Sequence, residues 1–338
     1  MNPRVTIVIP CYNCERTLGE AFDSCFEQGL RADDFEIVMV DDGSTDRTSF
    51  LMKGFASQHP QVRLFFHAKN RGGGAARNTG IREARGSYIY CLDSDNILGP
   101  KMLSKMLAFA ERNACDGVAV LERRFFSNDK DDYTLITNEI LERPLALDDL
   151  FSGKAAIMID NFLYTKPSYE KAGGYPEHHG FDTQAFEIRY LVAGNVIRVC
   201  PDTYSYHRIA ARHQSSYFER EYNKGNLSLN YFLIAGDMLP VLSDKALRMA
   251  IGFDVLSRNS VKDNLFDEMK KLGRSGELFR APGSAPSDAL AAEYRAKLRE
   301  VGTKENAAQS RTLYRWYHKA PVVSSLVTFY FKWKNSRK

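Results

Sequence analysis

The stretch SYIYCLDSDNIL, residues 87–98, decides the fold class. An apolar run that is typical of a strand buried on both faces ends abruptly in two carboxylates, at Asp93 and Asp95. Residues two positions apart in an extended segment project from the same side, so at ~5 Å these charges repel by about 3 kcal/mol at an effective dielectric constant of ~20. A divalent cation reverses the sign of that interaction, because Mg²⁺ and Mn²⁺ favour oxygen ligands and leave positions open for substrate phosphates. A solvated turn with helix-capping aspartates is the alternative.

Other apolar runs of the first 120 residues end in polar segments in the same way. VTIVI (5–9) leads into PCYN (10–13), and FEIVMV (35–40) leads into DDGSTD (41–46). Strand-like runs occupy 5–9, 35–40, 62–66, 87–92 and 116–121, and helix-like segments occupy 14–28, 46–58, 72–84 and 102–112. This alternation predicts an α/β fold with a mostly parallel sheet flanked by helices. Since ligands bind beyond the carboxyl ends of such strands, we expect the polar segments to share one ligand site.

The bulk composition is that of an ordinary globular protein. The chain has 338 residues, of which 44% are hydrophobic and 26% charged, and its net charge is +4. So mild a charge argues against nucleic acid as a partner. We expect a cytoplasmic protein, because no secretory leader is visible and no run approaches the ~20 apolar residues that span a bilayer.

Six cysteines lie in or beside apolar runs, and we expect them to be buried free thiols of a reducing compartment. Cys11 and Cys14 have the spacing of a zinc or redox pair. No second pair follows at a spacing that would complete a four-ligand zinc site, so a structural role is the preferred interpretation.

The chain changes character along its length. Residues 121 to about 215 are less regular, with the turn-rich segment 171–184, a helix-like segment at 186–195 and a strand-like run at 196–201 that leads to YSYHR (204–208). From about 216 to 338 the pattern is mainly helical. The tail 320–338 mixes aromatic and basic residues, which is typical both of a segment in a membrane interface and of a terminal helix docked on the protein.

The glycine-rich stretch at 72–80 invites a dinucleotide-binding interpretation but does not match the pattern. The sixth position of G-x-G-x-x-G is Arg77, and the stretch lies in the third strand–helix unit of the chain. A helix that begins here still favours an anionic ligand, and Arg77 or Arg71 has the reach to contact a base or a phosphate.

Three segments together carry a resemblance to a known family. They are VTIVIPCYNCERTLGEAFDSCFEQ (5–28), FEIVMVDDGSTDRT (35–48) and NRGGGAARNTGIREARGSYIYCLDSDNIL (70–98). The chain resembles the family-2 glycosyltransferases of the GT-A (Rossmann-like) fold, densely over residues 4–120 and patchily to about 210. The resemblance implies a GT-A domain over 1–215, with a nucleotide-binding half at about 1–120 and an acceptor half at about 121–215. It also implies sugar transfer from a nucleotide diphosphate donor with inversion at the anomeric carbon, usually with Mn²⁺ or Mg²⁺.

The resemblance also implies roles for individual residues. Pro10 and Tyr12 would flank the nucleoside base. Asp42 would hydrogen-bond to that base, and Asp41 would buttress Asp42.

On the same basis, Arg77 and Arg71 would line the nucleotide pocket, and Ser94 is counted with the nucleotide-binding residues. Asp93 would lie near the ribose and the metal ion, and Asp95 would be the main metal ligand.

The acceptor half departs from the family's pattern. The family usually has an acidic pair before a helix that ends in Ala-Gly, and the matching stretch GFDTQAFE (180–187) has one aspartate at that place. Asp182 is the predicted general base, with Glu187 in reserve, while a helix-capping turn is the structural alternative. His207 would add a metal or phosphate ligand, and His178 and His179 would contact acceptor or phosphate.

Two other functions stay open. A sugar-phosphate nucleotidyltransferase would share the sheet and Mg²⁺, but such enzymes open with a glycine-rich basic loop where this chain has PCYNCERT (10–17). A catalytically inactive nucleotide-binding module would explain the reduced acidic motif. For an active transferase we expect a UDP-sugar donor and a glycan or lipid-linked acceptor of bacterial surface polysaccharide or lipopolysaccharide synthesis. We expect the protein to act at the inner face of the cytoplasmic membrane and to add one or a few sugars.

Overall fold

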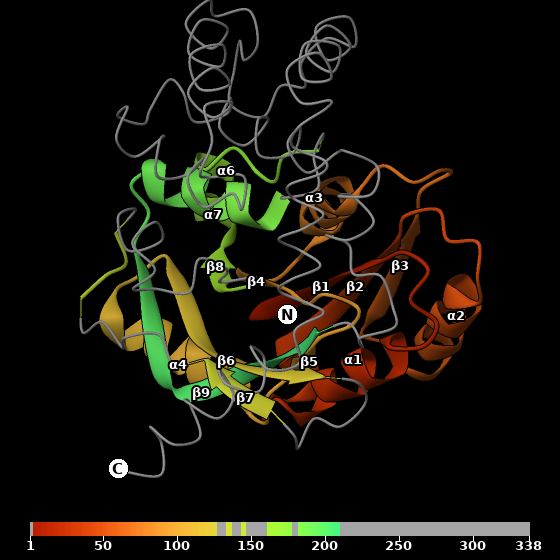
Figure 1. Cartoon of the computed structure of the whole chain (residues 1–338), viewed down its shortest axis with the longest axis horizontal. Helices are drawn as coiled ribbons and strands as arrows, with labels where there is room; N and C mark the ends of the chain where they lie inside the picture. Colours follow the sequence, from red (N-terminus) through yellow and green to blue (C-terminus); the bar gives the residue numbers. More distant parts are fainter. Residues whose placement is uncertain (1–2, 127–132, 137–142, 147–160, 178–181, 210–338) are drawn as a thin grey trace, which may run out of the picture.

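A computed structural model of the chain describes residues 3–126, 133–136, 143–146, 161–177 and 182–209 (Figure 1). The predicted helical region 216–338, the tail 320–338 and the pair His178 and His179 lie outside the described residues. No helix in the described part of the chain is long and apolar enough to cross a membrane.

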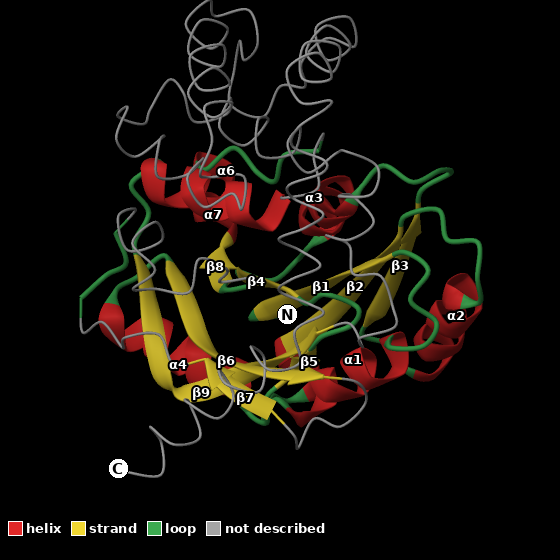
Figure 2. Cartoon of the chain, viewed as in Figure 1, coloured by secondary structure: helices red, strands yellow, loops and turns green. Residues whose placement is uncertain are grey.

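The described residues form one mixed sheet with helices on both faces (Figure 2). The strands are β1 (Val5–Cys11), β2 (Phe35–Asp41), β3 (Val62–Phe66), β4 (Tyr88–Cys91), β5 (Ile97–Leu98), β6 (Gly117–Phe126), β7 (Tyr133–Ile136), β8 (Leu163–Thr165) and β9 (Ile197–Ile209). The helices are α1 (Leu18–Ser24), α2 (Thr48–Gln58), α3 (Gly73–Glu83), α4 (Met102–Asn113), α6 (Lys166–Lys171) and α7 (Asp182–Val192), and 3₁₀ turns span Cys25–Glu27 and Ala32–Asp34.

The strand order is β3-β2-β1-β4-β8-β6-β9-β5, with β7 beside β6. Strands β3, β2, β1 and β4 run parallel, as do β6 and β9, whereas β8 is antiparallel to both β4 and β6. The predicted α/β class with a mostly parallel sheet is therefore confirmed. The pattern did not predict β5 and β8, which are two and three residues long and too short to show a periodicity of their own.

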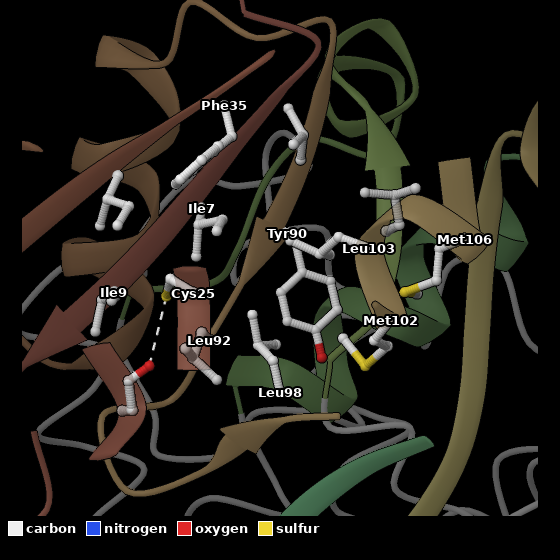
Figure 3. Packing of buried hydrophobic residues seen from close by; sticks show 14 of the residues in the cluster. Ile7, Ile9, Cys25, Phe35, Tyr90, Leu92, Leu98, Met102, Leu103 and Met106 are labelled. Atoms are coloured by element: carbon white, nitrogen blue, oxygen red, sulfur yellow. Dashed lines mark hydrogen bonds between the residues drawn. The ribbon is translucent and has the colours of Figure 1, made fainter. Parts of the chain in front are cut away.

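Side chains of the parallel strands alternate between two apolar clusters. Ile7 and Ile37 face a cluster with α1, α2 and α4, whereas Val8 and Val38 face a second cluster with α3, α6 and α7. Figure 3 shows the first cluster, in which Tyr90 of β4 lies among residues of α4. Burial on both faces explains why these strands are continuous apolar runs.

The six cysteines are all buried free thiols, as the sequence predicts.

In the second half of the described chain, two boundaries differ from the prediction. Helix α7 begins at Asp182 and not at 186, and β9 continues through Tyr204 and His207, which were expected to follow a strand. The register of β9 against β6 shifts near Pro201. Cys200 pairs with Val120, but the next residue of β6, Leu121, pairs with Tyr204. Proline cannot donate to the ladder, so the strand bulges there and then resumes.

Candidate active site

The carboxyl ends of β1, β2 and β4 meet at one edge of the sheet, as the alternation predicts. The pairing register sets Cys11 at the end of β1 beside Asp41 at the end of β2, and Val8 beside Cys91. Asp93 follows β4 directly. Three of the polar segments identified in the sequence are thus brought to the same edge, although 30 residues separate Cys11 from Asp41 and 52 separate Asp41 from Asp93.

Asp42 is buried and accepts hydrogen bonds from the protein itself. Both of its carboxylate oxygens accept from the backbone N–H of Arg71, at 2.9 and 3.0 Å, and Oδ2 also accepts from the backbone N–H of Gly72 at 2.8 Å. Asp41, also buried, accepts from the backbone N–H of Ser44 at 2.9 Å and from the hydroxyl of Ser49. Both aspartates therefore hold the turns that follow the strands. The expected contact of Asp42 with a nucleoside base stays a prediction.

A buried histidine joins Asp42 to helix α3. Nδ1 of His67 lies 2.6 Å from Oδ1 of Asp42, and its Nε2 lies 3.0 Å from the hydroxyl of Thr79. Because the carboxylate can only accept, Nδ1 carries a proton and donates to Asp42. The sequence analysis did not find His67, which has no motif around it; its only signal is a polar residue directly after β3.

The glycines at the start of α3 allow the acceptor half of the site to approach closely. A Cβ atom on Gly74 would lie 2.0 Å from the carbonyl oxygen of Pro176 and 3.2 Å from Cβ of Asp182. A Cβ on Gly73 would lie 2.7 Å from Nη1 of Arg77. The glycine-rich stretch thus serves close packing against residues 176 and 182, a use that the dinucleotide-binding pattern does not include.

Arg77 lies at the centre of the site. It projects from α3 and is only 6% exposed, with its guanidinium carbon 5.6 Å from the centre of the Tyr175 ring. One terminal nitrogen donates to Oδ2 of Asp182 and the other donates to Oδ1 of Asp93. Burial alone would lower the pKa of Arg77, but the carboxylates of Asp182 and Asp93 hold that pKa well above its ordinary value.

The two carboxylates of the D-x-D segment differ in their surroundings. Asp93 accepts from Arg77 and, through Oδ2, from the side-chain amide of Asn161 at 3.2 Å. Loss of solvent, and then the charge of Asp93, raise the pKa of Asp95 to about 6, while the nearby His207 acts in the opposite direction. Asp95 as a whole residue is exposed, and water screens part of the interaction of its charge with the neighbouring groups.

Strand β9 holds the loop that carries Asp95. The backbone N–H of Arg208 donates to Oδ1 of Asn96 at 3.0 Å, and its Nε donates to the backbone carbonyl of Asp95 at 3.0 Å. Nδ1 of His207 lies 3.4 Å from the amide nitrogen of Asn96 and 3.7 Å from Oε1 of Glu122. His207 also opposes, through its charge, the rise in the pKa of Asp95 that loss of solvent causes, and its role as a metal or phosphate ligand stays a prediction. The sequence analysis missed Asn96, Arg208 and Glu122 as parts of the site. These residues are far apart in the chain and come together because β9 pairs with β5 and β6.

The remaining nucleotide-site candidates lie around the β1 turn. Pro10 lies in β1 and is partly buried, and Tyr12, directly after the strand, is 49% exposed. Ser94 hydrogen-bonds to Cys14. The pKa of the Cys14 thiol is lowered, mainly by a hydrogen bond with Cys11 and then by the one with Ser94, although burial acts in the opposite direction.

Arg71 lies farther out than Arg77. Its side chain is 43% exposed and pairs with Glu177 at 3.2 Å. Glu177 also accepts from the side-chain amide of Asn78 at 2.8 Å, so Glu177 is held against α3.

Asp182 and Glu187 both belong to α7 but differ in place. Asp182 begins the helix, is 7% exposed and contacts Arg77, whereas Glu187 lies one and a half turns further on and is 1% exposed. Asp182 is therefore the carboxylate that shares Arg77 with Asp93.

A divalent cation fits the charges of this site. Asp93, Asp95 and Asp182 carry three negative charges when ionised, and Arg77 carries one positive charge, which leaves two negative charges among these four side chains. Within the described part of the chain, no three His, Cys, Asp or Glu side chains are close enough to form a metal site from protein ligands alone. That donor set suits an ion held by one or two carboxylates and completed by water and substrate phosphates.

Comparisons with known proteins agree with this geometry. The family model of Glycosyl transferase family 2 matches residues 6–173. The succinoglycan biosynthesis protein ExoO of Rhizobium meliloti is 35% identical over 173 residues, which are 50% of this chain and 48% of ExoO. The matched regions cover 51%, 44% and 32% of the length of the first three curated relatives.

Two solved structures share the fold. TarS residues 1–349 of S. aureus, crystallised with UDP-GlcNAc, has a TM-score of 0.59 and 19% identity, with 94% of this chain and 92% of that chain covered. The mannosyltransferase PcManGT of Pyrobaculum calidifontis, in complex with GDP-Man and Mn²⁺, has a TM-score of 0.54 and 20% identity, with 96% of this chain and 88% of that chain covered. At such identities the likeness establishes the fold alone.

Proposed function

Since residues 6–173 of the chain belong to glycosyl transferase family 2, we propose that the protein is an inverting, metal-dependent glycosyltransferase. It moves a sugar from a nucleotide diphosphate donor to a hydroxyl group of a glycan or glycolipid. The observation that carries the proposal is the row of side chains Asp93, Arg77 and Asp182, which joins the expected donor side of the sheet edge to the expected base.

The donor binds beyond β1, β2 and β4. Pro10 and Tyr12 flank the base at the mouth of the site, and the turns held by Asp41 and Asp42 shape the pocket below it. A UDP-sugar is the preferred donor because the TarS neighbour was crystallised with UDP-GlcNAc, although PcManGT was crystallised with GDP-Man. Ser94 and Asp93 contact the sugar-nucleotide from the β4 side.

A divalent ion, Mn²⁺ or Mg²⁺, would be held by Asp95 and Asp93, with His207 beside them. When bound, such an ion supplies Lewis-acid stabilisation of the negative charge that develops on the leaving diphosphate. The PcManGT neighbour, which was solved with Mn²⁺, supports the requirement.

Asp182 acts as the general base. Its carboxylate takes the proton of the acceptor hydroxyl while that oxygen forms a bond to the anomeric carbon and the bond from this carbon to the diphosphate oxygen breaks. Attack from the face opposite to the leaving group inverts the anomeric configuration. General-base assistance of this kind contributes typically ~10²–10⁴-fold to the rate.

The acceptor is a growing polysaccharide or a lipid-linked glycan at the inner face of the cytoplasmic membrane. The name of the relative ExoO, a succinoglycan biosynthesis protein, supports a polysaccharide product. The placement of Asp182 beside Asp93 supports an active transferase over an inactive nucleotide-binding module.

The test begins with calorimetric titration of UDP, GDP and dTDP, each with Mn²⁺ and with EDTA. We expect one nucleotide to bind in a metal-dependent manner, and Asp95→Ala to abolish the metal dependence. Asp33→Ala, an exposed carboxylate far from the sheet edge, is the matched control. Sugar transfer from the corresponding nucleotide sugar should then fall at least ~10²-fold in Asp182→Asn. Absence of binding by any nucleotide, or normal transfer by Asp95→Ala, would refute the proposal.

A further inference from the structure

Arg77 joins two carboxylates that come from opposite sides of the site. Asp93 follows β4, on the side where the donor is expected, and Asp182 begins α7, on the acceptor side. The guanidinium donates to each of them through a different terminal nitrogen. The planar fork of an arginine has a fixed shape, so a guanidinium bound at both ends sets the separation of its two partners.

The surroundings of Arg77 are built to keep it in this place. The side chain is 6% exposed and lies against the ring of Tyr175 at 5.6 Å. Gly73 leaves the space that Nη1 of Arg77 occupies, and Gly74 leaves the space for the backbone carbonyl of Pro176 and for Asp182. At Gly74 the neighbour is backbone, so a Cβ there could not be accommodated by a change of side-chain rotamer.

Both terminal nitrogens of Arg77 are thus already bound to protein carboxylates. A role in lining the nucleotide pocket, which the resemblance implies, would have to use the second N–H of a terminal nitrogen whose first N–H is already directed at a carboxylate. The remaining nitrogen, Nε, is buried and has no hydrogen-bond partner, so it too is shielded from an incoming nucleotide.

We propose that Arg77 is a positioning residue that acts through Asp182: it holds the base carboxylate at a set distance from Asp93 and hence from the anomeric carbon of the donor. This inference rests on the proposed function, in which Asp182 is the general base. It assigns to Arg77 a role in the rate of transfer and not in the affinity for the nucleotide.

Replacement of Arg77 by lysine separates a positioning role from a role in binding the nucleotide. Arg77→Lys keeps the positive charge, but an ammonium is a point charge without a fork and cannot hold both carboxylates in the same geometry. A base displaced by ~1 Å costs about 10²-fold in rate. We therefore expect Arg77→Lys to lower kcat by about 10²-fold and to change the dissociation constant of the nucleoside diphosphate by less than about threefold.

A double-mutant comparison tests whether Arg77 acts through Asp182. If it does, Arg77→Lys in an Asp182→Asn background lowers kcat no further, since groups that act as a unit give non-additive losses. Arg82→Met, an exposed arginine on the same helix α3, is the matched control and should leave kcat unchanged. Nucleotide affinity is measured by calorimetry on the same preparations.

Two results would overturn the proposal. One is a rise of tenfold or more in the nucleotide dissociation constant with kcat retained, which would make Arg77 a nucleotide ligand. The other is a loss of kcat in the double variant equal to the product of the single losses, which would make the two residues independent.

Failure of the proposed function is recognised separately. If the wild-type protein transfers no sugar from any donor, the pairing of Arg77 with Asp182 is measured by thermal denaturation of Arg77→Met, Asp182→Asn and the double variant. Recovery of Tm in the double variant over Arg77→Met supports the placement of Asp182 by Arg77, because removal of one partner leaves a buried charge uncompensated. No recovery would overturn it. If Arg77→Met does not fold, Arg77→Gln, which is also uncharged but polar, replaces it in the same comparison.

Discussion

Replacement of Gly74 by alanine tests the close approach on which the site depends. The added Cβ would lie 2.0 Å from the carbonyl oxygen of Pro176, and Cβ contacts shorter than 3.0 Å are essentially not observed. Helix α3 or the 174–177 loop must therefore move by at least 1.0 Å. The neighbouring atom is backbone, so it cannot be relieved by a change of side-chain rotamer.

The expected cost has two parts. Overpacking of this kind destabilises a fold by about 1–3 kcal/mol. The added Cβ would also lie 3.2 Å from Cβ of Asp182, which pushes Asp182 away from α3 and Arg77. A misplacement of ~1 Å should lower the rate of sugar transfer by about 10²-fold.

The assay combines thermal denaturation followed by circular dichroism with steady-state transfer kinetics at saturating donor. Gly54→Ala is the matched control, because Gly54 lies in helix α2 and a methyl group there has open space. Alanine at that position should stabilise the protein by about 0.5–1 kcal/mol and leave the rate unchanged. A Gly74→Ala variant with wild-type Tm and wild-type kcat would refute the reasoning.

Three further predictions concern other parts of the described chain. Glu36→Leu should cost about 1–3 kcal/mol in urea denaturation, because it removes the buried Oε1 that accepts from Thr6 at 2.7 Å and from the Arg85 backbone at 2.6 Å and leaves both donors without that acceptor. Glu83→Leu, at a side chain that is 45% exposed, should cost less than ~0.5 kcal/mol, and equal losses would contradict the assignment. Tyr12→Ala should weaken nucleotide binding by about tenfold in calorimetry through loss of an exposed stacking ring, and an unchanged dissociation constant would remove Tyr12 from the donor site. Iodoacetamide at pH 8 should leave Cys91 unmodified in the folded protein, as judged by peptide mass spectrometry, because burial raises the pKa of this thiol to about 11; rapid labelling without denaturant would show that the site is open.

Much of the parallel part of the fold was predictable from local sequence. Strand β3 occupies the predicted residues 62–66, and α3 and α4 begin within one residue of the predicted starts. These elements have strong periodicity or continuous β-branched runs, which depend on neighbours in the chain. The short antiparallel strands β5 and β8 were missed because their extended form depends on partners elsewhere in the sheet, β9 for the first and β4 and β6 for the second.

The sequence predicted which residues gather at the candidate site but not which contacts they make there. The pattern of carboxylates after buried strands placed Asp41, Asp42 and Asp93 at one edge of the sheet, and the structure agrees. The pattern did not show that Asp42 is held by His67 and by the backbone of the glycine-rich turn. Hydrogen-bond partners that lie 25 to 30 residues away leave no periodic signal.

What the sequence by itself determined is therefore the alternation of strands and helices and the sheet edge at which the polar residues gather. Only the tertiary structure decided which side chains meet there. Arg77 is 105 residues from Asp182 in the chain, and their contact depends on strand order, on register and on glycines that allow α3 to approach the 174–177 loop. Backbone conformation follows from near neighbours, whereas the pairing of buried charges follows from packing across the whole sheet.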